Sequence, residues 1–142
     1  MKVRTINELQ DKLDHEIQWR KKEIIDYKFI IEKNRESTRI IPLVRGGIAL
    51  SYAHWEGFVK MSSSIFVSFI STKKIPLDQM KLNFIALSYQ KRLNKGNGIE
   101  ECIQLIEDII ANNQKACKIH DKDIIDTKSN LKFHVLKDIL IS

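Results

Sequence analysis

Helix-breaking residues are scarce in this chain. Its 142 residues include only five glycines and two prolines, so long stretches run without either. A β-sandwich needs a turn every few residues, and turns draw on glycine and proline, so this scarcity argues against such a fold. Hydrophobic residues make up 43% and charged residues 30% of the chain, a balance that excludes an intrinsically disordered protein. Long helices in an all-α domain are therefore expected.

Apolar residues recur every three or four positions in several segments, which is the spacing of one face of a helix. Residues that start or stop helices bound these segments: the capping-box residues Thr5 and Glu8, Pro42 and Pro76 in first turns, and a Gly96–Gly98 turn. The second helix should begin at residues 38–41. The helices expected from these signals cover about residues 5–33, 38–70, 76–95, 99–111 and 129–141.

Four or five antiparallel helices in an up-and-down bundle are the simplest arrangement of these segments. The length suits one compact domain over residues 1–142. The first residues are polar, and no run of about 18 apolar residues occurs, which argues against a signal peptide and a membrane span. We therefore expect a cytoplasmic protein that does not enter a membrane.

The chain has a formal net charge of +6, from 24 basic and 18 acidic residues mixed along its length. Mixed charge is a weaker sign of nucleic-acid binding than one dense basic block, so nucleic-acid contact stays open on this evidence. The basic run Arg20, Lys21 and Lys22 on the first helix is a candidate surface for RNA phosphates, as is Lys60 on the second. The alternative is that these cations form only the solvated side of amphipathic helices.

The second helix carries titratable and aromatic side chains in an otherwise apolar stretch. The string is Tyr-Ala-His-Trp-Glu-Gly-Phe-Val-Lys, from Tyr52 to Lys60. Tyr52, Trp55 and Val59 recur at steps of three and four, which favours a place in the core over a cofactor site. These aromatic residues are therefore expected to be packing residues.

His54 and Glu56 make the best candidate site, because a histidine and a glutamate lie close together in this apolar stretch. For His54 two alternatives stay open: a hydrogen-bonded packing residue, or a group that transfers a proton. Glu56 and Lys60 are four residues apart, in the order that favours an ion pair on a helix surface. His120, Asp121 and Asp123 have no recognised ligand spacing around them, so no metal site is expected.

The Tyr52–Lys60 string resembles the signature of one prokaryotic branch of the HEPN superfamily. Three further strings extend the resemblance over almost the whole chain: Trp19–Glu23, Leu43–Arg45 and Thr127–Leu131. The resemblance implies an all-helical up-and-down bundle that forms homodimers in bacterial toxin–antitoxin, antiphage and RNA-processing systems. It also implies a metal-independent endoribonuclease activity, so neither a metal nor another cofactor is expected.

In active members of that superfamily an arginine is followed, after four to six residues, by a histidine at the dimer cleft. The arginine would stabilise phosphate charge, and the histidine would assist proton transfer at the ribose 2′-hydroxyl. In this chain Arg45 and His54 have eight residues between them. On a straight helix they would lie on opposite faces, about 13.5 Å apart along the axis. A bend at Gly46–Gly47, or a second subunit whose Arg45 meets His54, would be needed to join them.

The resemblance also implies an Arg-Asn and His motif on a further helix, which this sequence does not contain before Ser142. We therefore expect either a shortened, non-cleaving member or a piece of a longer protein, with one fewer helix at the C-terminal side. Arg45, His54 and Glu56 remain the candidate catalytic residues within the sequence.

Three hypotheses follow. The leading one is a HEPN-like protein of a bacterial antiphage or toxin–antitoxin system that acts on or binds RNA, with a second copy and an antitoxin or defence-complex protein as partners. The second is a non-catalytic HEPN module for dimerisation or partner binding, in which His54 and Glu56 form a buried polar network. The third is a basic adaptor that binds nucleic acid through its first helix.

Overall fold

The computed structural model describes residues 2–93, 98–117 and 119 of the 142-residue chain. All its regular elements are helical, and the described residues include no strand, so the all-α prediction is confirmed. The helix predicted over residues 129–141 lies outside the described residues. The elements are α1 (Ile6–Lys33), α2 (Ile40–Thr72), the 3₁₀-helix η1 (Leu77–Gln79), α3 (Leu82–Leu93) and α4 (Ile99–Ala111).

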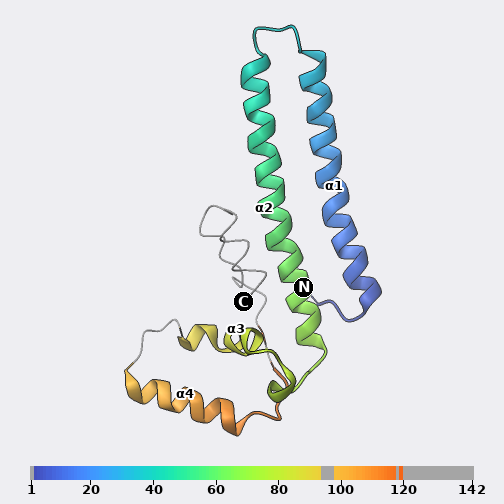
Figure 1. The fold of residues 1–142 in the computed structure, drawn as a ribbon. Coiled ribbons are helices and arrows are strands. Elements are labelled where there is room, and N and C mark those ends of the chain that lie inside the picture. Colours follow the sequence, from blue (N-terminus) through green and yellow to red (C-terminus); the bar gives the residue numbers. More distant parts are fainter. Residues whose placement is uncertain (1, 94–97, 118, 120–142) are drawn as a thin grey trace.

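The described helices form two antiparallel pairs (Figure 1). The long helices α1 and α2 lie side by side as a hairpin, which we call the arm. The shorter helices α3 and α4 run in opposite directions and lie across the lower end of α2. Among the described helices, α3 and α4 thus lie at the lower end of the arm. Among the described residues, no helix is both long and apolar enough to cross a membrane.

The ends of α1 and α2 follow local signals in the sequence. The Thr5 side chain accepts a hydrogen bond from the Glu8 backbone N–H at 3.1 Å and so caps α1. Glu8 in turn accepts a hydrogen bond at 2.7 Å from the backbone N–H of Arg4, one residue before the usual capping-box donor. Pro42 lies in the first turn of α2. A backbone N–H in this turn has no carbonyl of the same helix to bond, so proline costs no hydrogen bond there. Both predicted helices are confirmed within two residues.

The third helix differs from the prediction, which started it at Pro76. Pro76 and Met80 have extended backbones, so the chain forms only the short η1 between them, and α3 begins later, at Leu82. The reason is that this segment pairs with residues 115–117. The Leu77 N–H donates to the Lys115 carbonyl at 3.2 Å, and the Cys117 N–H donates to the Ile75 carbonyl at 2.9 Å.

The main cluster of buried residues lies at this lower end. Val67 of α2, Leu77 of η1, Cys117 and Ile119 form it, and partly buried residues of α3 pack against it. Burial raises the pKa of the Cys117 thiol. In the arm, by contrast, α1 has no fully buried residue, because among the described helices α2 alone packs along it. The core therefore sits at the end of the arm and joins the last part of α2 to η1, α3 and residues 117 and 119.

Gly46 and Gly47 allow α1 to approach α2 closely. They do not bend α2, which continues through them unbroken. A Cβ atom added at Gly46 would overlap the Tyr27 hydroxyl of α1. At Gly47 it would come within 3.0 Å of Ile31 Cδ1. Two glycines in a row thus let the side chains of α1 rest on the backbone of α2.

We predict that Gly46→Ala destabilises the protein by about 1–3 kcal/mol, because the added methyl group overpacks the contact with Tyr27. Urea unfolding followed by circular dichroism measures this change. In a Tyr27→Phe background the hydroxyl oxygen is absent, so the same substitution should be neutral or stabilising through the better helix propensity of alanine. An equal loss of stability in both backgrounds would contradict the proposed contact.

Candidate functional site

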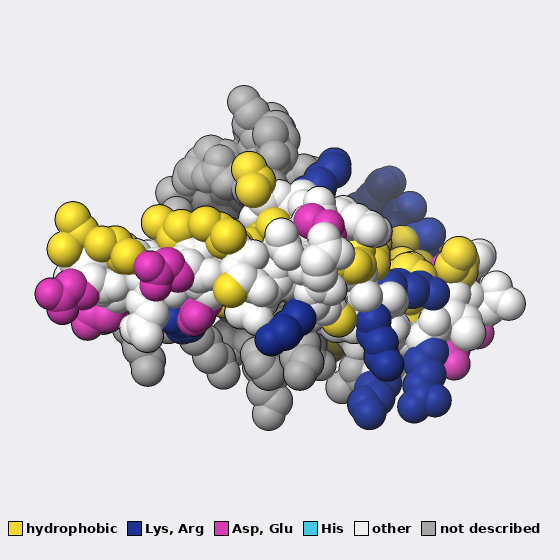
Figure 2. Space-filling model, turned by 90° about the horizontal axis from the view of Figure 1, so that it is seen from below, with side chains coloured by type: hydrophobic (Ala, Val, Ile, Leu, Met, Phe, Trp, Pro, Cys, Tyr) yellow, Lys and Arg dark blue, Asp and Glu magenta, His cyan; other side chains and the backbone are white. Residues whose placement is uncertain are grey.

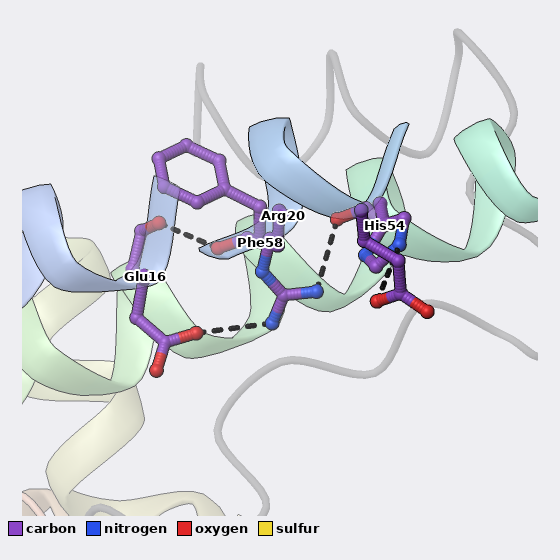
Figure 3. A network of polar contacts seen from close by, with 6 residues as sticks. Glu16, Arg20, His54 and Phe58 are labelled. Atoms are coloured by element: carbon purple, nitrogen blue, oxygen red, sulfur yellow. Dashed lines mark hydrogen bonds and ion pairs between the residues drawn. The ribbon is translucent and has the colours of Figure 1, made fainter. Parts of the chain in front are cut away.

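His54 lies on the face of α2 that is turned toward α1. Its residue surface is 7% exposed, and its ring meets the Trp19 ring edge-on, with 5.3 Å between centroids. The imidazole Nε2 lies 3.2 Å from Glu23 Oε2 of α1, although the angle is outside hydrogen-bond geometry. Figure 3 shows His54 on α2, close to α1. His54 is therefore an interior group of the arm and contacts α1 from within.

Arg20 of α1 joins the two helices beside this histidine. Its Nη1 donates to the backbone carbonyl of His54 at 3.3 Å, and its Nη2 donates to Glu16 at 3.0 Å (Figure 3). The guanidinium carbon also lies 4.4 Å from the centre of the Trp19 ring, a cation–π arrangement. We call Glu16, Trp19, Arg20, Glu23 and His54 the cross-helix cluster.

Gly57 makes room for this guanidinium group. A Cβ atom at Gly57 would lie 2.7 Å from Arg20 Nη1, closer than side-chain atoms normally approach. Gly57 belongs to the string that carries the HEPN resemblance, so part of that string has a packing role. The glycine lets an arginine of α1 reach a backbone carbonyl of α2 in the middle of a helix.

The chemistry available to the cross-helix cluster follows from its charges. It combines two carboxylates, one guanidinium group and one imidazole, and the side chains of Arg20 and Glu16 are only 12% and 17% exposed. An imidazole beside a carboxylate is an arrangement that can orient the ring for proton transfer. Here, however, the ring is enclosed, and both outer nitrogens of Arg20 are used within the protein. The contacts that these side chains make within the protein join α1 to α2.

The structure keeps the other candidate site residues apart from this cluster. Arg45 is exposed on α2, and the unbroken helix leaves it on a different face from His54. Lys21 and Lys22 are exposed on α1. Lys60 forms an ion pair with Glu56 at 3.0 Å along α2. The carboxylate that contacts the imidazole is that of Glu23.

The comparison with protein-family models now adds to this geometry. The model of the RiboL-PSP-HEPN family matches residues 15–142, which is most of the chain. The chain belongs to the RiboL-PSP-HEPN family. HEPN domains of this kind are generally linked to ribonuclease activity. No curated protein and no solved structure matches the chain.

Two carboxylates of the cross-helix cluster in this HEPN domain, Glu16 and Glu23, were not predicted to be site residues, although Glu23 closes the Trp19–Glu23 string. A signal for them exists, because Glu16, Arg20 and Glu23 are spaced by four and three residues and so form one polar line along α1. The line alternates acid, base and acid beside the apolar face. Arg20 was predicted to contact RNA, whereas its guanidinium group in the structure contacts Glu16 and the His54 carbonyl.

Tyr52 and Trp55 of the HEPN signature were expected in the core, and this expectation is wrong. They are 36% and 39% exposed and meet each other edge-on, with ring centroids 6.2 Å apart. The physical reason is that only α1 covers this part of α2 among the described helices, so a second apolar face stays open. In residues 2–93, 98–117 and 119, no group of three or more metal-ligating side chains is placed to hold a metal ion.

We predict that Arg20→Lys destabilises this HEPN domain by about 1–3 kcal/mol, because one ammonium group cannot replace a fork that bonds two separate acceptors. Chemical unfolding of the purified protein measures the change. Lys21→Arg, a matched substitution at the neighbouring exposed cation, should change stability by less than about 0.5 kcal/mol. Equal stabilities of the two variants would show that Arg20 has no special role in joining the helices.

Proposed function

We propose that this protein acts on RNA in the bacterial cytoplasm as part of an antiphage or toxin–antitoxin system. The observation that carries the proposal is the family match over residues 15–142, because RiboL-PSP-HEPN domains are generally linked to ribonuclease activity. The formal net charge of +6 supports it further, since a positive protein is drawn toward a polyanion. The proposed reaction is a cleavage of RNA that needs no metal ion.

Such a cleavage needs a group that removes the proton of the 2′-hydroxyl and a cation that stabilises the phosphate. His54 with its neighbour Glu23 supplies an imidazole and a carboxylate, and Arg45 supplies an exposed guanidinium group. Within one chain Arg45 and His54 are about 13.5 Å apart along the axis of α2. We therefore propose that a homodimer forms the complete site, in which Arg45 comes from the second copy and Glu56 lies beside the cleft.

Exposed apolar side chains on the arm support a protein partner. Phe29 and Ile48 are 57% and 66% exposed, and an apolar groove of about 410 Å³ runs between α1 and α2 beside Tyr27 and Val44. Soluble proteins rarely leave such patches open unless a partner covers them. A second copy of the chain is the proposed occupant. An antitoxin or another protein of a defence complex is the alternative partner.

A second candidate function is favoured by one specific observation, the enclosure of His54. Its imidazole contacts Trp19 and Glu23 from inside the arm and is 7% exposed. A buried polar group with partners on both helices fixes how the helices pair. In this alternative the protein is a non-catalytic HEPN module, which binds RNA or a partner protein without cutting RNA.

Incubation of purified protein with RNA in EDTA tests the proposal. The wild type should cut the RNA, and Arg45→Ala should lower the cleavage rate by at least about 100-fold, because a phosphate-stabilising cation is removed. His54→Gln should lower it similarly. Arg39→Ala, which removes another arginine near the start of α2, is the matched control and should cleave at the wild-type rate. Thermal unfolding of every variant identifies losses caused by misfolding.

The outcomes separate the candidates. Binding of RNA without any cleavage by the wild type would support the non-catalytic module. Cleavage that persists in both Arg45→Ala and His54→Gln would remove these residues from the mechanism. If the wild type neither binds nor cuts RNA, the proposed action on RNA is wrong.

A further inference from the structure

The segment that precedes α1 meets the end of α2 at the lower end of the arm. Both segments carry basic residues. The Thr72 hydroxyl, at the end of α2, donates to the Val3 carbonyl at 2.7 Å, and the Val3 side chain is fully buried. Next to it, Lys73 Nζ donates to the Arg4 carbonyl at 3.3 Å. These contacts fix the N-terminal segment beside the end of α2. We call Lys2, Arg4, Lys73 and Lys74 the end cluster.

All four residues of the end cluster are exposed. Figure 2 looks at this end of the molecule and shows Lys and Arg side chains gathered on its right-hand side, with Asp and Glu side chains gathered on the left. No carboxylate of the described residues forms an ion pair with any of the four cations. In contrast, Lys28 pairs with Glu32 and Lys60 pairs with Glu56 along their own helices. The end cluster thus gathers four cations without an ion pair among the described residues. The Glu8 carboxylate accepts from the backbone N–H of Arg4 at 2.7 Å, and Lys73 Nζ lies 4.5 Å from the centre of the Phe69 ring.

The backbone conformation of Lys74 is unusual for a lysine. Its φ angle is 52°, in the left-handed region that glycine adopts without steric cost and that other residues rarely adopt. It follows Lys73, the C-cap of α2, at the position where helices usually place a glycine. A lysine therefore occupies a site where glycine would suit the fold better. Its presence there is explained if its charge is needed for binding.

We infer that the end cluster binds the phosphate backbone of RNA. The inference rests on the proposed action on RNA and adds where the strand is held. Hydrogen bonds join the two segments that carry these four cations, so the cations lie at one end of the arm, and contacts of cations with a phosphate backbone are independent of base sequence. His54 lies 19 residues from Lys73 on α2, about 28 Å along its axis. An RNA strand that reaches both would run along the arm.

The test measures binding of the full chain to a fluorescein-labelled 2′-O-methyl oligouridine in EDTA, since this RNA has no free 2′-hydroxyl and cannot be cut. Arg4→Glu/Lys74→Glu should weaken binding at least tenfold. It should also lower the slope of log Kd against log salt concentration by about 0.7 for each phosphate that the variant no longer binds. Arg35→Glu/Arg39→Glu carries the same change of net charge at the other end of the arm, where both side chains are exposed, and should weaken binding by less than threefold.

Lys74→Gly separates binding from folding. It should weaken RNA binding severalfold and at the same time raise the urea midpoint of unfolding, because glycine suits the left-handed backbone. If Lys74 served only to stabilise the end of α2, the midpoint would fall and binding would not change. That result would overturn the inference.

Three further results would overturn it. Equal weakening in the two double variants would mean that net charge, and not the end cluster, governs binding. Unchanged binding in Arg4→Glu/Lys74→Glu would mean that the RNA strand binds elsewhere on the protein. The proposed function would still stand if that variant cut ordinary RNA at saturating RNA concentrations. Binding of the wild type to phosphatidylglycerol vesicles but not to the oligouridine would replace RNA by a membrane surface and would count against the proposed function as well.

Discussion

The packing of α1 against α2 is the contact on which the described structure depends. A hairpin of two helices can cover only one face of each helix, so apolar contacts alone leave the pairing loosely specified. Tyr27 against Gly46 and Gly47 fixes the upper arm, and Arg20 against His54 and Gly57 fixes its middle. Each contact joins a long side chain of α1 to the bare backbone of α2. The register between the helices therefore follows from a few shape-specific contacts more than from a continuous apolar core.

The same contacts change how the HEPN signature is understood. His54 and Gly57 of the signature meet Trp19 and Arg20, which belong to the second string that carried the resemblance. Two strings that lie far apart in the sequence thus form one cluster across the arm. Part of the signature maintains the pairing of α1 with α2. Tyr52 and Trp55 of the same signature are exposed on the face of α2 that the described helices do not cover.

The sequence predicted the helices well and their surroundings less well. Capping at Thr5 and the position of Pro42 located α1 and α2, because these signals act within one turn of a helix. The break between η1 and α3 was missed, since it depends on pairing with residues 115–117, a contact that no local pattern records. Exposure of Trp55 was missed for a related reason. Helical periodicity identifies an apolar face but does not say which neighbour covers it.

For the candidate site, the sequence identified His54 but not the residue that faces it. Glu56, two residues along the same helix, was the expected partner, whereas Glu23 comes from the other helix and contacts the imidazole. Partners across helices follow from the register between them, which the sequence alone does not give. The wide spacing of Arg45 and His54 was visible in the sequence, and the unbroken α2 preserves it.

Proton NMR of the folded protein tests the central claim, that His54 is held inside the arm against α1. The account predicts nuclear Overhauser contacts between the His54 imidazole and Trp19 indole protons, whose ring centroids lie 5.3 Å apart. An isotope label on the histidine rings separates their signals from those of the other side chains. Comparison with the His54→Gln variant identifies the signals of His54. The account would be contradicted if these contacts were absent and a paramagnetic relaxation agent in the solvent broadened the His54 signals.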